Sequence, residues 1–179
     1  MSTHTEVEVP LLRAPGLAAP HGFTTRAGGV SQGPFATLNL GAHVGDAPEA
    51  VQENRDRLLK ASGLERLAVL DQIHGADVVE LRLSDARDDL APCAIGDAAI
   101  TRDPGLGLCI GSADCLPILI DGGTSGWVGS EGFSGSGTGC GGTSGSMHGG
   151  PNHLGAAEAN ACQGWALLAG TCAGAGAGA

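Results

Sequence analysis

Two residues in this sequence combine metal-binding chemistry with a suitable position, His74 and Cys115. His74 follows an apolar run and precedes Gly75, which predicts a place at the end of a strand. Cys115 lies between Asp114 and an apolar run that begins at Leu116, which predicts the mouth of a second strand. A thiolate and an imidazole from neighbouring strand ends suit Zn²⁺, which takes three protein ligands in catalytic sites and keeps one position for water. Zinc lowers the pKa of that water to about 7.

Other interpretations of these residues stay open. A cysteine in an apolar context is usually a small core residue, and a single histidine is usually a hydrogen-bonded surface or core group. Cys115 and His74 also suit the nucleophile and base of a metal-independent cysteine hydrolase. The Asp114 carboxylate either orients His74 or another ligand through a hydrogen bond, or caps a turn.

A second set of polar residues suits a phosphate and a sugar. Arg26 precedes a glycine-rich segment, and a guanidinium beside exposed backbone N–H groups binds anions well. The alternative is a tight turn with Arg26 facing solvent. Asn39 and His43 flank a short loop and are candidates for hydrogen bonds to a ribose or a base, with structural capping of the loop as the alternative. Arg26, Asn39, His43 and Asp114 are therefore the candidate substrate-binding residues.

The elements that must position these residues are several strands and one clear helix. Asp46 is expected to cap the helix, Pro48 lies in its first turn, and Gly63 is placed to end it. Its apolar face consists of Val51, Leu58 and Leu59. The expected strands are residues 21–26, 67–73, 78–83, 97–101, 106–111 and 116–120, of which the last two are expected to be buried. The sum is an α+β fold with more strand than helix.

Composition excludes several classes of partner. The chain has 179 residues, a formal net charge of -10 and 42% hydrophobic residues. An acidic surface repels phosphate backbones and anionic lipid, so we expect no nucleic acid and no membrane as partner. No apolar run has the length of a membrane span. The first residues do not form a secretory signal, so we expect a cytoplasmic protein whose six cysteines are thiols.

The last third of the chain has an unusual composition. Residues 122–179 contain 19 of the 32 glycines and none of the nine basic residues. One interpretation is a flexible low-complexity tail. The presence of Trp127, Phe133 and Trp165 argues against it, and favours a stretch whose residues differ from those that the gene encodes.

Three segments in register resemble one known family. The first runs from His21 to Asp46 and contains H-G-F-T-T-R-A-G-G-V-S and L-N-L-G-A-H-V-G-D. The second is Q-I-H-G at 72–75, and the third is A-D-C-L-P-I-L at 113–119. Together they resemble the laccase-domain, or polyphenol oxidase, family (YfiH-like), whose members are also described as purine nucleoside phosphorylases and as a peptidoglycan editing factor. The resemblance covers residues 20–121.

The resemblance implies a single laccase-like domain over residues 1–179. Its fold would be a layered α/β/β/α arrangement with mixed β-sheets, the fold named after YfiH-like cysteine hydrolases. The resemblance also implies a metal, zinc or copper, held by two histidines and one cysteine. His74 matches the first histidine and Cys115 the cysteine. The second histidine belongs to an H-A-G-W-R-G motif, which is missing, since no histidine lies between His74 and His148. The family spacing places it near Glu131, a carboxylate that is itself able to bind zinc.

Four functions follow as expectations. The first is a zinc-dependent purine nucleoside enzyme acting on small molecules, with phosphorolysis of adenosine, inosine and methylthioadenosine and with deamination of adenosine. The second is a copper-dependent polyphenol oxidase, which the chemistry disfavours, because O₂ reduction calls for several coppers and many histidines while this chain has six. The third is a metal-independent cysteine hydrolase, and the fourth is a non-enzymatic role in cell-wall editing.

Overall fold

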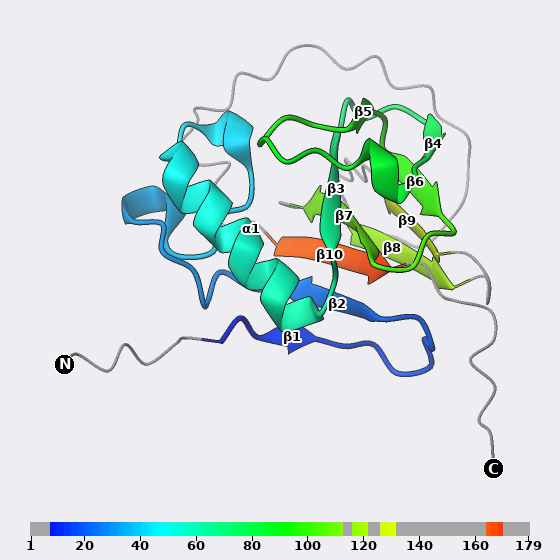
Figure 1. Cartoon of the computed structure of the whole chain (residues 1–179), viewed down its shortest axis with the longest axis horizontal. Helices are drawn as coiled ribbons and strands as arrows, with labels where there is room; N and C mark the ends of the chain where they lie inside the picture. Colours follow the sequence, from blue (N-terminus) through cyan, green and yellow to red (C-terminus); the bar gives the residue numbers. More distant parts are fainter. Residues whose placement is uncertain (1–7, 113–115, 122–125, 132–163, 170–179) are drawn as a thin grey trace, which may run out of the picture.

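The computed structural model describes residues 8–112, 116–121, 126–131 and 164–169, the last two segments as backbone (Figure 1). Asp114 and Cys115 lie outside the described residues, as does Phe133. Within the described part of the chain, no helix combines the length and the apolar character needed to cross a membrane.

The strands form two sheets, each with parallel and antiparallel neighbours. The six-stranded sheet contains, in spatial order, β1 (Leu11–Leu12), β2 (His21–Thr24), β10 (Gly164–Ala169), β7 (Leu106–Ser112), β3 (Arg66–Asp71) and β5 (Ala94–Ile95). The four-stranded sheet contains β4 (Val78–Glu80), β6 (Ala98–Thr101), β9 (Gly126–Glu131) and β8 (Leu116–Asp121). The pairs β3–β7, β3–β5 and β4–β6 are parallel and the others are antiparallel. The expected α+β class with mixed sheets is confirmed.

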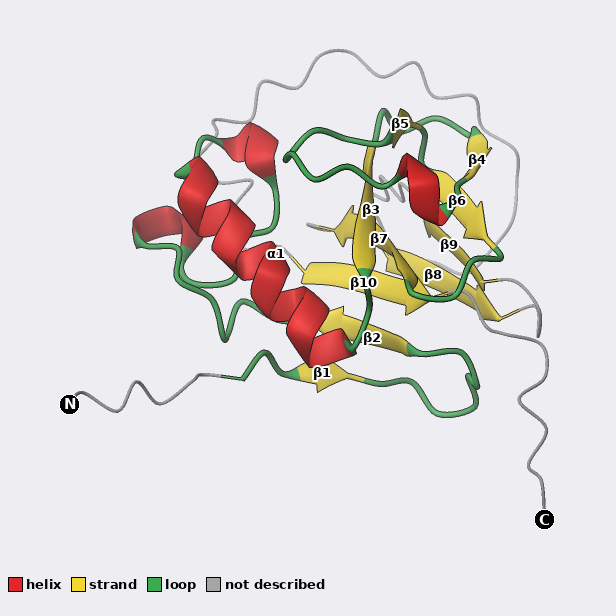
Figure 2. Ribbon diagram, viewed as in Figure 1, coloured by secondary structure: helices red, strands yellow, loops and turns green. Residues whose placement is uncertain are grey.

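Alternation along the central strands explains the layers. Successive side chains of a strand point to opposite faces. Leu108 and Ile110 of β7 therefore join the core that faces the four-stranded sheet, whereas Cys109 between them joins the core that contains Leu58 of the helix. The six-stranded sheet consequently lies between helix α1 (Pro48–Ser62) and the four-stranded sheet, as Figure 2 shows.

Helix α1 matches the expected span, but its N-terminus differs. Gly63 ends it with a left-handed backbone at φ 72, and Val51 and Leu58 are fully buried. The N-cap residue is Ala47, without a side-chain cap, so the prediction that Asp46 caps the helix is wrong. The Asp46 carboxylate is instead engaged by side chains of the preceding loop.

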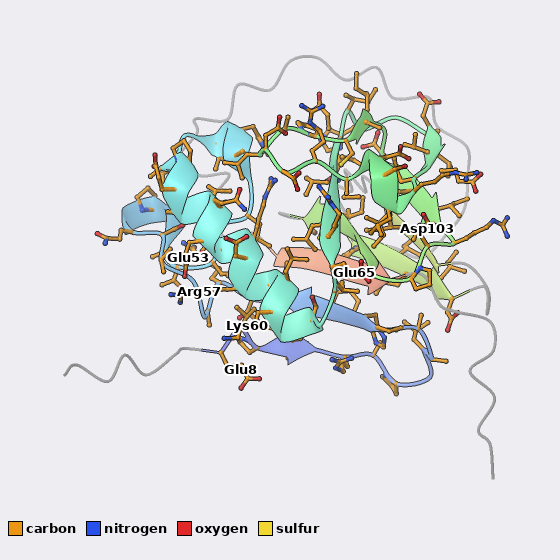
Figure 3. The ribbon with its side chains drawn as sticks, in the orientation of Figure 1. Glu8, Glu53, Arg57, Lys60, Glu65 and Asp103 are labelled. Carbon is orange, nitrogen blue, oxygen red and sulfur yellow. The ribbon has the colours of Figure 1, made fainter. Side chains whose placement is uncertain are left out.

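The helix presents a charged face away from the sheet. Figure 3 shows Glu53, Arg57 and Lys60 along one side of α1. Glu53 and Arg57 form an ion pair at 2.8 Å, one helical turn apart. An amphipathic helix of this kind covers a sheet with its apolar side and meets solvent with the other.

The expected ends of two strands and the expected burial of a third need correction. Strand β2 ends at Thr24 and β4 ends at Glu80, earlier than expected. Strand β8 is not a buried strand, since Leu116 and Ile120 are 70% and 51% exposed. Residues 126–131 and 164–169 form strands β9 and β10, in agreement with the argument against a flexible tail for these two segments.

Candidate functional site

The loop that carries His74 is anchored to the central strand β7 by a glutamine. The Gln72 side chain accepts a hydrogen bond from the Gly111 N–H at 2.8 Å and donates one to the Gly111 carbonyl at 3.2 Å. A side-chain amide has the same donor and acceptor pair as a peptide group. Gln72 therefore extends the pairing of β3 with β7 beyond Asp71, where the β3 backbone leaves the sheet.

His74 occupies the point where the chain turns away. Its φ is 58, and among the described residues other than glycine it is the one with a positive φ. The buried carboxylate of Asp97 accepts the N–H of His74 at 2.8 Å and the N–H of Gly75 at 2.7 Å. Both carboxylate oxygens are thus used to hold two consecutive amides of this turn.

The described part of the site suits a metal ligand. The His74 side chain is exposed and forms no hydrogen bond with another residue that the structure describes. Its imidazole is accordingly available to a ligand, while its backbone is fixed. Within residues 8–112 and 116–121 no group of three histidine, cysteine or acidic residues is placed to bind a metal, so a site requires ligands from elsewhere in the chain.

The other expected ligands are related to strands β7, β8 and β9 by sequence position and backbone register. Cys115 lies outside the described residues, three positions after Ser112, the last residue of β7, and one position before Leu116, the first residue of β8. The backbone of Glu131 is the register partner of Leu116 across the antiparallel β8–β9 pair. The strand after β8 therefore returns beside it, and Glu131 as a third ligand stays a prediction.

Arg26 is tied into its own loop. Its Nε donates to the Ala36 carbonyl at 2.9 Å, and Nη2 donates to the Pro34 carbonyl at 2.8 Å. The Arg26 carbonyl accepts the N–H groups of Thr37 and Leu38. These bonds give Arg26 a structural task in holding residues 26–38 together, and its role toward phosphate stays a prediction.

Asn39 is buried, and His43 is exposed in a short 3-10 turn, Ala42–Val44. The Asn39 amide donates to the Gly41 carbonyl and to Asp46 and accepts the Gly41 N–H. This is the structural capping of the loop that the sequence analysis gave as the alternative to ribose binding. The roles of His43 and Asn39 as nucleoside contacts stay predictions. The role of Asp114 in orienting His74 stays a prediction as well.

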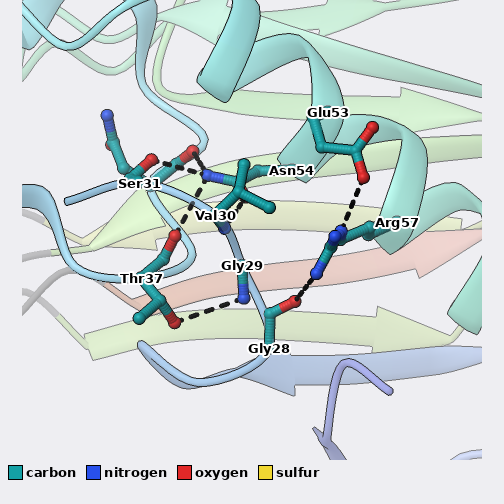
Figure 4. Close-up of polar contacts among 9 residues, drawn as sticks. Gly28, Gly29, Val30, Ser31, Thr37, Glu53, Asn54 and Arg57 are labelled. Carbon is teal, nitrogen blue, oxygen red and sulfur yellow. Dashed lines mark hydrogen bonds and ion pairs between the residues drawn. The ribbon is translucent and has the colours of Figure 1, made fainter. Parts of the chain in front are cut away.

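A buried amide that the sequence analysis did not single out organises the glycine-rich loop (Figure 4). Asn54 of α1 is fully buried and donates to Ser31 Oγ and to the carbonyls of Thr37 and Asn39. A Cβ at Gly29 would lie 2.1 Å from the Thr37 carbonyl oxygen, so only glycine fits there. The available signal was a polar residue between Val51 and Leu58, the apolar residues of the inner helix face; Arg55 beside it is buried as well.

Two of the cysteines are described, and both are thiols. Cys109 is 2% exposed on β7, and burial raises its pKa to about 12, so it stays protonated as a core residue. Cys93 is partly buried beside the same core as Leu70. Neither lies in the His74 turn, and Cys115 stays the predicted ligand on the strength of its sequence motif.

Sequence reasoning also missed the residues that support His74. Gln72 was noticed only as part of a motif, and Asp97 only as the start of a strand. Asp97 lies 23 positions from His74, so no local pattern connects them. The usable signal was a single acidic residue between Gly96 and an apolar strand, because a buried carboxylate must have partners.

Comparison with known proteins identifies relatives of this chain. A family model described as multi-copper polyphenol oxidoreductase laccase matches residues 20–131. A purine nucleoside phosphorylase from Deinococcus radiodurans is 49% identical over 114 residues, which are 63% of this chain and 42% of that protein. A purine nucleoside phosphorylase from Pseudomonas aeruginosa is 50% identical over 98 residues, 54% of this chain and 37% of that protein. The chain spans about two-fifths of the length of these relatives.

Solved structures of similar fold include two proteins named YlmD and YfiH. YlmD from Geobacillus stearothermophilus superimposes with a TM-score of 0.60 at 32% identity, over 71% of this chain and 53% of that one. YfiH from Bacillus licheniformis, described as a hypothetical protein, gives a TM-score of 0.57 at 28% identity, over 63% and 45% of the two chains.

Proposed function

The chain belongs to the family of the multi-copper polyphenol oxidoreductase laccases, and we propose that it acts as a zinc-dependent purine nucleoside phosphorylase. Relatives named purine nucleoside phosphorylase at 45 to 50% identity support this activity over the alternatives. The structural observation that carries it is His74, whose imidazole is exposed and whose backbone is held by Asp97. Its loop is tied through Gln72 to Gly111, near the end of β7 after which Cys115 follows in the sequence.

The residues that would hold zinc are His74, Cys115 and a third ligand at or near Glu131. When bound, zinc supplies a Lewis acid and a water of lowered pKa. Zinc fits the expected donor set better than a hard cation does, since an imidazole and a thiolate are ligands that it prefers. Asp114, directly before Cys115, is proposed to orient a ligand by a hydrogen bond.

The substrates proposed are adenosine, inosine and methylthioadenosine together with phosphate. A phosphate oxygen forms a bond to C1′ of the ribose while the bond from C1′ to the base nitrogen breaks, and the base leaves with a proton. Arg26 is proposed to bind the phosphate, with Asn39 and His43 as contacts of the nucleoside. The proposal includes hydrolytic deamination of adenosine, in which water replaces ammonia on the purine ring.

The name of the family favours a second candidate, a copper-dependent polyphenol oxidase. One site with two histidines and a cysteine suits copper as well as zinc. Reduction of O₂ to water, however, is a multi-electron reaction that one such site does not supply. Metal analysis and substrate assays separate the two candidates directly.

Purified protein is tested for metal content by mass spectrometry and for release of hypoxanthine from inosine in the presence and absence of phosphate. We expect about one zinc per chain and phosphate-dependent release. His74→Ala and Cys115→Ala should each lose most of the zinc, because two remaining ligands hold the ion poorly. Gln52→Ala, which removes only an exposed hydrogen bond to Asp56 on α1, is the control and should keep both properties. Full zinc occupancy in both ligand variants would remove the site assignment, and phenol oxidation with copper bound would favour the second candidate.

A further inference from the structure

The turn at His74 is held in a conformation that histidine does not adopt by preference. A left-handed backbone costs a residue with a Cβ roughly 1–2 kcal/mol relative to the right-handed one. His74 has φ 58, and the next residue, Gly75, bears no side chain. Such a conformation persists only where the surroundings impose it.

The surroundings that impose it converge on one side chain. Asp97 is 4% exposed, and its two oxygens accept the N–H groups of His74 and Gly75 at 2.8 and 2.7 Å. Hydrogen bonds from backbone N–H groups to a carboxylate are stronger than those to a neutral oxygen. The Asp97 backbone is fixed in turn, because its N–H donates to the Asp77 carbonyl on the far side of the same loop.

The same loop is fixed at its other end by the exchange of two hydrogen bonds between Gln72 and Gly111. His74 therefore sits between two anchors, one on β7 and one at the start of β6. The hydrogen bonds of both anchors go to backbone groups or to β7, and neither anchor forms a hydrogen bond with the imidazole, so both act on the ring through the backbone.

We infer that Asp97 is a positioning residue for His74, setting the backbone from which the imidazole is presented to the metal. This inference rests on the proposed function for its purpose, since a fixed imidazole matters most to a site that needs its ligands preorganised. This role is more specific than general stabilisation of the fold, because both carboxylate oxygens of Asp97 accept hydrogen bonds from the N–H groups of His74, the proposed metal ligand, and of the next residue, Gly75. Loss of a group that orients a ligand typically weakens metal binding by about 10–100-fold.

The main variant is Asp97→Asn, which preserves shape but replaces one acceptor oxygen by a donor NH₂ group. The matched control is Asp121→Asn, because Asp121 also accepts two consecutive amides, Ala18 at 3.1 Å and Ala19 at 2.9 Å, through one oxygen at the end of β8 remote from Leu116. Thermal unfolding of both variants shows how much of any effect is general destabilisation.

The first measurement needs no metal. Amide hydrogen exchange by NMR in the metal-free protein should show faster exchange at His74 and Gly75 in Asp97→Asn, by about tenfold or more, and no change there in Asp121→Asn. Unchanged exchange at both amides in Asp97→Asn would overturn the inference and leave the proposed function untouched.

The second measurement is the zinc dissociation constant, obtained by competition with a chromophoric chelator. Asp97→Asn should weaken zinc binding about tenfold or more, and Asp121→Asn by less than about twofold. In a His74→Ala background, Asp97→Asn should have no further effect, because the group through which it acts is gone.

The outcomes separate the two proposals. If the wild type binds zinc and Asp97→Asn binds it equally well, the positioning role is overturned while the proposed function stands. An equal loss with and without His74 overturns it as well, since it then acts on the fold in general. A wild type that takes up no zinc overturns the proposed zinc site, and with it the purpose assigned to Asp97, whatever the exchange data show.

Discussion

The Oδ1 atom of Asn54 accepts a hydrogen bond from the N–H of Val30 at 2.8 Å, so that helix α1 holds the glycine-rich loop through a fully buried amide (Figure 4). The amide nitrogen of Asn54 donates to Ser31, Thr37 and Asn39. One side chain thus connects both halves of the loop that contains Arg26 and Asn39 to the scaffold.

Replacement of this amide should be costly. In Asn54→Ala the Val30 N–H and three acceptors lose a buried partner, and we expect a loss of about 2–4 kcal/mol in the free energy of unfolding. Urea denaturation measures it. Gln52→Ala, which removes one exposed hydrogen bond to Asp56 on the same helix, should cost less than about 0.5 kcal/mol. Equal effects of the two substitutions would contradict the importance given to burial.

His74 offers a test of strain against function. Glycine tolerates a positive φ and alanine does not, so His74→Gly should be more stable to urea than His74→Ala by about 1 kcal/mol. Both variants should lose zinc to the same degree, because both lack the imidazole. If the alanine variant proves as stable as the glycine variant, the left-handed backbone at this position is not retained in solution.

Arg26→Ala should raise the KM for phosphate in the phosphorolysis assay, as expected for a residue that binds the anion. It should also lower the free energy of unfolding by about 1–3 kcal/mol, because the carbonyls of Pro34 and Ala36 lose their charged donor. Steady-state kinetics at varied phosphate, with denaturation curves on the same samples, measure both. A stability loss with an unchanged KM for phosphate would assign Arg26 to the loop alone.

Asp46 should make a small contribution to acid sensitivity. Burial alone would raise the pKa of Asp46, but hydrogen bonds from Ser31, Asn39 and the Ala47 N–H outweigh it and lower this pKa below 3.8. A carboxylate with a depressed folded-state pKa stabilises the fold above its unfolded-state pKa and loses that contribution as pH falls through the folded-state value. Between pH 5 and pH 3, the free energy of unfolding should therefore fall less steeply in Asp46→Asn than in the wild type, by less than about 1 kcal/mol, since Asp46 is partly exposed. A steeper fall of the free energy of unfolding in Asp46→Asn would show that the pKa of Asp46 is not lowered in the folded state.

The last prediction concerns the missing histidine motif, most of which lies outside the described residues. The register of β8 with β9 brings the Glu131 backbone opposite Leu116, the residue that follows Cys115 in the sequence, and the proposed zinc site needs a third ligand. We predict that the protein encoded by the gene has a histidine near residue 131, followed within a few positions by Trp and Arg. Intact-mass measurement with peptide sequencing of residues 122–179 decides it. Peptides that read Gly-Ser-Glu-Gly-Phe-Ser would instead show that this chain lacks the family's third ligand and is a degenerate, non-catalytic member.

Local patterns in the sequence predicted the helix and the approximate positions of β2, β3, β4, β6, β7 and β8, but not β1, β5, β9 or β10. The apolar run before His74 predicted a strand end there, and Pro48 and Gly63 bounded the helix within a residue or two. These features depend on neighbours within a few positions, through side-chain periodicity and the backbone preferences of proline and glycine. The family motifs are of the same local kind.

Only the tertiary structure decided which distant residues serve the site. Asp97 reaches His74 across 23 positions, Gln72 reaches Gly111 across 39, and strand β10 enters the sheet between β2 and β7. Asp46, a plausible helix cap by sequence, is used by Ser31 and Asn39 because the loop folds back against it. Partners of buried polar groups are chosen by the packing of the whole chain, and no pattern within a short window specifies them.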